Sequence, residues 1–202
     1  MTSVTRSSAR SALAGGAALV LLLVAAGCTG DDDPGDGGGG DGSSSSGAGD
    51  DAAVETVTTL QNVGDALEPS QREKVKTAVT ELVDPWFEGA FLGDFPRDDY
   101  AGAFAGFSEG AAADAQGRDL AVLSNQAIAD QIDSATAVNR RVRVDVFAPD
   151  GHPRGATAHF VLDYETTGGL EEQRRVRGDL YLARERGVWT IFGYDVDEAV
   201  TR

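Results

Sequence analysis

The residues best suited to acid–base chemistry lie in the C-terminal third of the chain. His159 and Asp163 share one face of a predicted strand, but four residues at about 3.3 Å each separate them by about 13 Å, too far for a hydrogen bond. Hairpin pairing offers His159 nearer partners. A turn centred on Gly168-Gly169 pairs it with Asp179, and the preceding hairpin brings Asp145 beside it. The sequence therefore predicts an imidazole flanked by two carboxylates, residue types that general acid–base catalysis uses.

The same alignment places this row of charges on the outer face of the sheet. The alignment pairs Asp163 with Arg175. The charged side chains then lie on one face of the sheet, and the Val, Phe and Leu side chains that should contact the helices lie on the other face. We therefore interpret the row as a solvated face with cross-strand pairs of opposite charge, and we predict no catalytic residue in it. His152 and His159 are not at ligand spacing with acids or thiols, so we expect no metal site and no cofactor.

A second candidate site is the space between the helices and the sheet. There Arg140, Tyr164 and Tyr194 are placed to point polar groups inward, toward a small apolar substrate. An open cavity of about 300–1,000 Å³ with convergent polar groups would favour a ligand. A filled interior would favour partners that contact the surface.

Strands must position these residues, because the hydrophobic period is two from Ala137 onward. The first strand alternates polar residues with Val138, Val142, Val144 and Val146. Turn signals follow at Pro149-Asp150-Gly151, Gly168-Gly169 and Arg186-Gly187. Because short turns join neighbouring strands in opposite directions, the segment predicts a four-stranded antiparallel meander.

The residues before the meander predict one strand and then helices. Val54 to Val63 is rich in β-branched residues and predicts a strand. Ser70 and Glu73 form a capping box, and apolar residues then recur every three or four positions, so a long amphipathic helix is expected. Pro85 should kink this helix or end it near Asp84.

Further helical segments complete the predicted layer. Asp98 or Asp99 can cap a second helix, and Gly110 interrupts the segment that follows. Leu120 to Ile132 predicts a helix or an irregular segment beneath the sheet. The fold class is therefore α+β, with N-terminal helices packed on one face of a curved antiparallel sheet. The residues that we expect to be buried together are Trp86, Phe87, Phe104, Phe160, Leu162, Leu180 and Ile191.

This order of elements, closed by the segment Gly187 to Tyr194 (GVWTIFGY), resembles the nuclear-transport-factor-2-like superfamily. The resemblance covers most of residues 54–202 and implies a cystatin-like cone of helices and sheet. Unlike that superfamily, this chain has no clear β-hairpin between its first predicted helices. Polyketide cyclases, small isomerases and the soluble domains of mammalian-cell-entry-associated proteins share the fold, and the last of these are exported and membrane-tethered. A fold alone does not assign a function.

The N-terminus predicts export. Residues 1–27 combine Arg6 and Arg10 with a short apolar run and small residues, which is typical of a secretory signal peptide. The segment Leu23 to Cys28 (LVAAGC) resembles the bacterial lipobox, although Ala25 stands where the family prefers Leu. The resemblance implies that Cys28 receives a diacylglyceryl group, that the signal is cut before it, and that the new amine can also be acylated, for example with palmitate. The chain is then expected on the extracytoplasmic face of the cell membrane.

Two other interpretations of the N-terminus stay open. One is an ordinary signal peptide with an Ala-Ala-Gly cleavage site, and the other is an uncleaved membrane anchor. A spanning helix needs about 20 apolar residues, and residues 12–28 are fewer and include three glycines. Cys28 is the single cysteine, so no disulfide within the chain explains it.

The rest of the chain divides into a linker and a domain. Residues 28–53 begin with the lipidated Cys and continue in Gly, Asp and Ser, a composition that predicts disorder. Residues 54–202 form a single predicted domain. The formal net charge of −16 excludes a broad electrostatic surface for nucleic acid.

Two functions fit these expectations. The first is a membrane-tethered, non-enzymatic binding or assembly module. Its partner is an unknown protein or a small apolar ligand. The module could also form a homodimer through the face of the sheet. The alternative is an isomerase- or cyclase-like enzyme with its substrate in the cone.

Composition also gives a test of the linker. Mild proteolysis of residues 29–53 should leave the melting temperature of the domain unchanged, because the segment has no large apolar side chain to bury. Calorimetry of the intact and trimmed chains measures this. A fall of several degrees on trimming would mean that the segment docks on the domain.

Overall fold

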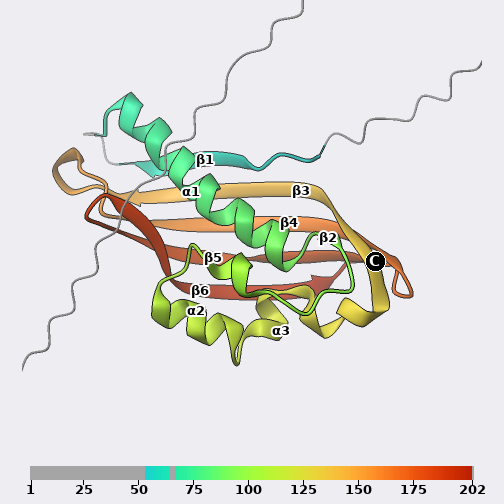
Figure 1. Cartoon of the computed structure of the whole chain (residues 1–202). Helices are drawn as coiled ribbons and strands as arrows, with labels where there is room; N and C mark the ends of the chain where they lie inside the picture. Colours follow the sequence, from blue (N-terminus) through green and yellow to red (C-terminus); the bar gives the residue numbers. More distant parts are fainter. Residues whose placement is uncertain (1–52, 64–66, 202) are drawn as a thin grey trace, which may run out of the picture. The chain divides into compact units, whose positions relative to one another are not determined.

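The computed structural model describes residues 53–63 and 67–201, which fall within one compact unit, Gly49–Arg202. This part is a mixed α+β fold with an open six-stranded sheet (Figure 1). The main strand order is β1-β3-β4-β5-β6, and the short β2 pairs with β3. The strands are β1 (Val57–Val63), β2 (Gly93–Asp94), β3 (Ile132–Phe147), β4 (Gly155–Gly168), β5 (Gln173–Glu185) and β6 (Val188–Val200).

The predicted meander is confirmed, and the sheet gains an unexpected edge. Strands β3 to β6 pair antiparallel in chain order. Strand β1, in contrast, runs parallel to β3, so the prediction of a wholly antiparallel sheet was wrong. The reason is the connection: helix α1 (Pro69–Ala90) returns the chain across the sheet before β3 begins, and such a crossover allows parallel pairing.

Helix α1 is longer than its sequence signals suggested. It begins at Pro69 with Glu68 as N-cap, so Ser70 lies inside the first turn and the predicted capping box does not form. Proline is favoured at this position, because its missing N–H would be unpaired there anyway. Pro85 neither ends nor interrupts the helix, which continues to Ala90. Burial of Trp86 and Phe87 directly after Pro85 offsets the lost hydrogen bond.

Short helical turns replace the other predicted helices. Asp99 does accept a hydrogen bond from the Ala101 N–H (2.9 Å), but only the 3-10 turn η1 (Ala101–Phe104) follows. Gly106 packs against Leu82 of α1 so closely that an added Cβ would lie 2.8 Å from its Cδ2. The remaining helices and turns are α2 (Glu109–Gln116), which includes Gly110, α3 (Leu120–Leu123), η2 (Asn125–Ala127), η3 (Ala129–Gln131) and η4 (Pro149–Gly151).

A β-bulge in β3 corrects one predicted core position. The register between β3 and β4 shifts between Ala137 and Asn139, which leaves Val138 as the extra residue with 53% of its surface exposed. Val138 was expected on the inward face. Beyond the bulge the alternation resumes, with Arg140, Val142 and Val144 buried on the side of α1.

The predicted core is confirmed. All of its residues are at most 1% exposed: Trp86, Phe87, Phe104, Phe160, Leu162, Leu180 and Ile191. The Trp86 ring packs edge-on against Phe160 of β4, with 5.0 Å between ring centroids, and its Nε1–H donates to the Leu123 carbonyl (3.1 Å). Helix α1 is thereby fixed across the sheet, as Figure 1 shows.

The described residues include no helix that is both long enough and apolar enough to span a membrane. The expectations for the signal peptide, Cys28 and the linker as far as Ala52 lie outside the described residues.

Truncation at the centre of the core should be costly. Phe160→Ala should lower the free energy of unfolding by about 3–5 kcal/mol, the range for a buried aromatic side chain. Denaturant unfolding measures it. The control is Phe147→Ala on the same sheet, where the side chain is 66% exposed, and the loss should stay within about 0.5 kcal/mol. A loss below about 1 kcal/mol for Phe160→Ala would contradict the assigned core face.

Candidate functional site

The predicted histidine cluster forms on the outer face of the sheet. His159 Nδ1 lies 2.6 Å from Asp179 Oδ1, and its Nε2 lies 3.2 Å from Asp145 Oδ2. Asp179 is the cross-strand partner of His159, as expected, whereas Asp145 reaches it diagonally, because Arg143 is the residue directly opposite. Asn62 of β1 donates to Asp145 from its backbone N–H (3.2 Å) and from its side chain (2.9 Å).

These contacts favour the charged imidazolium. Burial alone lowers the pKa of His159, but the hydrogen bonds and charges of Asp179 and Asp145 outweigh it, so the pKa is raised above its ordinary value. Burial tends to raise the pKa of Asp145, yet hydrogen bonds from Asn62 and His159 lower it overall. In the imidazolium form both ring nitrogens are donors, which matches the two carboxylates that they face.

The neighbouring pair has the same character. Arg175 Nε donates to Asp163 Oδ1 (2.6 Å), and Asn139 Nδ2 donates to its Oδ2 (2.9 Å). The hydrogen bond from Arg175 is the main reason that the pKa of Asp163 is lowered. The cross-strand pairing of Asp163 with Arg175 is therefore confirmed, and it places opposite charges side by side on neighbouring strands.

The three residues predicted to point inward, Arg140, Tyr164 and Tyr194, each form hydrogen bonds in a different part of the fold. Arg140, buried after the β3 bulge, donates to Asp84 (3.0 Å), to Thr56 (2.9 Å) and to Glu88. Its guanidinium thus joins α1 and β3 to Thr56, the residue before β1. It also borders an open hollow of about 650 Å³ at the edge of the sheet.

Tyr164 is engaged deep in the core. Its hydroxyl lies 2.6 Å from Asn125 Oδ1 and 3.0 Å from Glu198 Oε1, and Arg174 donates to the same Glu198 oxygen (2.9 Å). Burial and the Glu198 charge raise the pKa of Tyr164 well above its ordinary value. The phenol stays neutral and cross-links η2, β4 and β6.

Tyr194 completes the set at the far edge of the sheet. Its hydroxyl donates to Asp119 Oδ2 (2.7 Å), and burial followed by this hydrogen bond raises its pKa. The contact joins β6 to the residue before α3. The structure therefore does not bring Arg140, Tyr164 and Tyr194 together around one cavity.

Aromatic rings occupy the space where the enzyme hypothesis needs a cavity. Trp86 contacts Phe87, Phe91, Phe107 and Phe160, with ring centroids 5.0–6.2 Å apart. Phe91 in turn lies 6.2 Å from Tyr164. The layer between α1 and the sheet is a packed core at this point.

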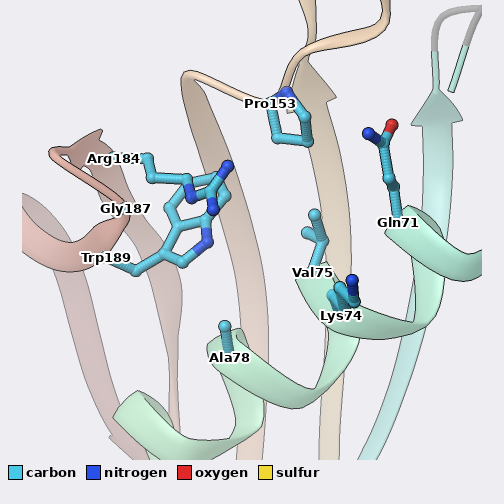
Figure 2. Close-up of a pocket in the computed structure, with 8 residues that line it drawn as sticks. All are labelled: Gln71, Lys74, Val75, Ala78, Pro153, Arg184, Gly187 and Trp189. Carbon is cyan, nitrogen blue, oxygen red and sulfur yellow. The ribbon is translucent and has the colours of Figure 1, made fainter.

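A pocket that the sequence did not reveal lies at one end of this layer (Figure 2). It has a volume of about 270 Å³, and three chain segments meet there: the start of α1, Pro153 before β4, and the β5–β6 hairpin. Its lining residues are Gln71, Lys74, Val75, Ala78, Pro153, Arg184, Gly187 and Trp189.

Local signals explain how these side chains converge. Gln71, Lys74, Val75 and Ala78 are spaced i, i+3, i+4 and i+7, so they share one face of the first turns of α1. Arg184 and Trp189 are direct cross-strand partners, so their side chains lie on the same face of the hairpin. The helical spacing was the only signal in the sequence, and it gave no indication of the hairpin that would face it.

Within the described ranges, no group of three or more His, Cys, Asp or Glu side chains is placed to hold a metal ion. A comparison with family models, curated proteins and solved structures found no match to this chain. The residues and their geometry therefore carry the functional proposal.

The histidine cluster predicts a specific pH dependence. A raised folded pKa means that His159 contributes stability fully below the unfolded value of about 6.5, and that this contribution is lost as the pH rises through the folded pKa. Pairs this exposed contribute about 0–1 kcal/mol, so His159→Ala should fold almost normally.

An NMR titration of the imidazole checks this. The pKa should lie above about 6.5 and should fall in Asp179→Asn, which removes the nearer carboxylate. A pKa of the unmodified chain below about 6.5 would instead indicate a desolvated imidazole and would support the enzyme hypothesis.

Proposed function

We propose that this chain is a lipoprotein, acylated at Cys28 and held on the extracytoplasmic face of the cell membrane, whose folded domain is a non-enzymatic binding module. The N-terminal signal and the single cysteine support the anchor. Two or more acyl chains would give stable attachment, since each buried methylene contributes about 0.8 kcal/mol.

One observation carries the proposal of a binding module: the core between α1 and the sheet is filled. Trp86, Phe87 and Phe160 are each at most 1% exposed, and they occupy the position where a cone-shaped enzyme would hold its substrate. Tyr164 and Arg140 are engaged with carboxylates of the chain itself. Partners and ligands then have to bind at the surface.

The domain further fits a nuclear-transport-factor-2-like or cystatin-like cone. Support comes from the order of its elements, in which a long helix precedes a four-stranded meander and packs across it. Only the soluble domains of mammalian-cell-entry-associated proteins, among the groups that the sequence resembles, share the membrane-tethered arrangement. The likeness supports an accessory role in the cell envelope over catalysis.

The alternative is an isomerase- or cyclase-like enzyme. It would require a conformation in which Trp86 or Phe160 leaves the core and opens a cavity beside Tyr164. Burial of a large apolar side chain contributes about 1.5–3 kcal/mol, which weighs against such an opening. A homodimer through the sheet face stays a prediction; Phe147 and Phe192, 66% and 57% exposed, are apolar residues that it would cover.

The anchor is tested by Cys28→Ser in the cell that makes the protein. The variant should incorporate no labelled fatty acid and should either stay as the uncleaved precursor or leave the membrane, because serine lacks the thiol that is acylated. Thr29→Ala, one residue beyond the cysteine, is the control and should behave as the unchanged protein. Membrane retention of Cys28→Ser at the mature size, without acylation, would contradict the proposal.

A further inference from the structure

The pocket in Figure 2 has a charge opposite to that of the molecule. Lys74 and Arg184 line it, and no carboxylate is among its described lining residues. The formal net charge of the chain is −16. Arg140, Arg174 and Arg175 are paired with acids. Neither Lys74 nor Arg184 forms an ion pair with any carboxylate in the residues that the structure describes.

Apart from Gln71, the rest of the lining is apolar and aromatic. Trp189, half-buried, faces the pocket beside Arg184, while Val75 and Pro153 are buried at its border. Figure 2 shows Arg184 and Trp189 side by side on one wall and the α1 side chains on the other. The pocket therefore combines cationic donors with an aromatic surface.

We propose that this pocket binds a small organic anion, with Lys74 and Arg184 contacting its carboxylate or phosphate group and Trp189 packing against its apolar ring. The volume of about 270 Å³ lies just below the range of about 300–1,000 Å³ for drug-sized ligands, so the ligand class is a single ring bearing one anionic group. The planar guanidinium of Arg184 can donate two parallel hydrogen bonds to a carboxylate or a phosphate, and the ammonium group of Lys74 adds a compact positive charge.

The position of the pocket suits a tethered protein. It lies where β5 turns into β6, at the same end of the sheet as the β3–β4 turn. Strand β1 starts beside the middle of β3 and runs toward that end, since Val57 pairs with Arg141 and Val63 with Val146. Figure 1 shows the chain entering β1 from the side away from the β5–β6 turn. Ala53, the last residue of the predicted linker, borders a hollow with Ala135 and Thr167 and is thus remote from the pocket. This inference names the ligand of the binding module proposed above and so rests on that function.

The two tryptophans give a direct experiment. The full chain, purified in detergent, is titrated with phenyl phosphate and with benzoate while the indole N–H signals of Trp86 and Trp189 are followed by NMR. The Trp189 signal should shift to saturation with at least one of them, and the anion that binds more tightly identifies the preferred group. The Trp86 signal should stay in place, because its Nε1–H is buried and bonded to Leu123.

Matched variants separate the site from general charge effects. Lys74→Gln and Arg184→Gln should each raise the dissociation constant about tenfold, as expected for loss of a charge-assisted contact. Lys76→Gln, the control, removes the only other lysine, which pairs with Glu73 at 3.1 Å and does not line the pocket; its effect should stay below about twofold.

Several outcomes would overturn the proposal. One is the absence of a saturable Trp189 shift. Another is binding of uncharged benzyl alcohol, or of inorganic phosphate, which has no ring, as tight as that of phenyl phosphate or benzoate. A third is an equal effect of Lys74→Gln and Lys76→Gln on the dissociation constant. The titration measures ligand binding at the pocket whether or not Cys28 is acylated. Mass spectrometry of the same sample measures the acylation. Failure of the ligand proposal and failure of the membrane anchor are therefore distinguishable.

Discussion

Packing of Trp86 against Phe160 is the contact on which the other features of this domain depend. It joins the C-terminal part of α1 to a central strand, with ring centroids 5.0 Å apart, and the Trp86 indole also donates to the Leu123 carbonyl. Because both rings are almost completely buried, the helix has little freedom to slide along the sheet. The position of Gln71 and Lys74 opposite the β5–β6 hairpin follows from this fixed crossing, since they lie on the same rigid helix.

The same packing explains why polar chemistry moves to the edges of the fold. With the centre filled by aromatic rings, the buried polar residues serve to connect elements. Arg140 joins α1 and β3 to Thr56, the residue before β1, and Tyr164 joins η2 to β4 and β6. Each is satisfied by partners within the chain, as buried polar groups must be. The cations beside Trp189 are different, because the described part of the chain provides no acid to pair with them.

A filled interior with a cationic pocket at one end fits the proposed capture of a ligand better than its conversion. The acidic surface repels anions in general, so a local pair of cations can select those whose ring also fits against Trp189. The row of paired charges around His159 occupies the outer face of the sheet and holds neighbouring strands together there.

The sequence by itself determined the period-two strands, the pairing of His159 with Asp179, the identity of the core aromatics and the expectation of a lipid anchor. Each of these depends on spacing within a short segment or across a single hairpin, which local periodicity records. Only the tertiary structure decided that Pro85 stays inside α1, that β1 pairs parallel to β3, that Val138 is displaced by a bulge, and that Lys74 and Trp189 line one pocket. These features depend on packing between segments far apart in the chain, where the burial of large side chains outweighs local preference.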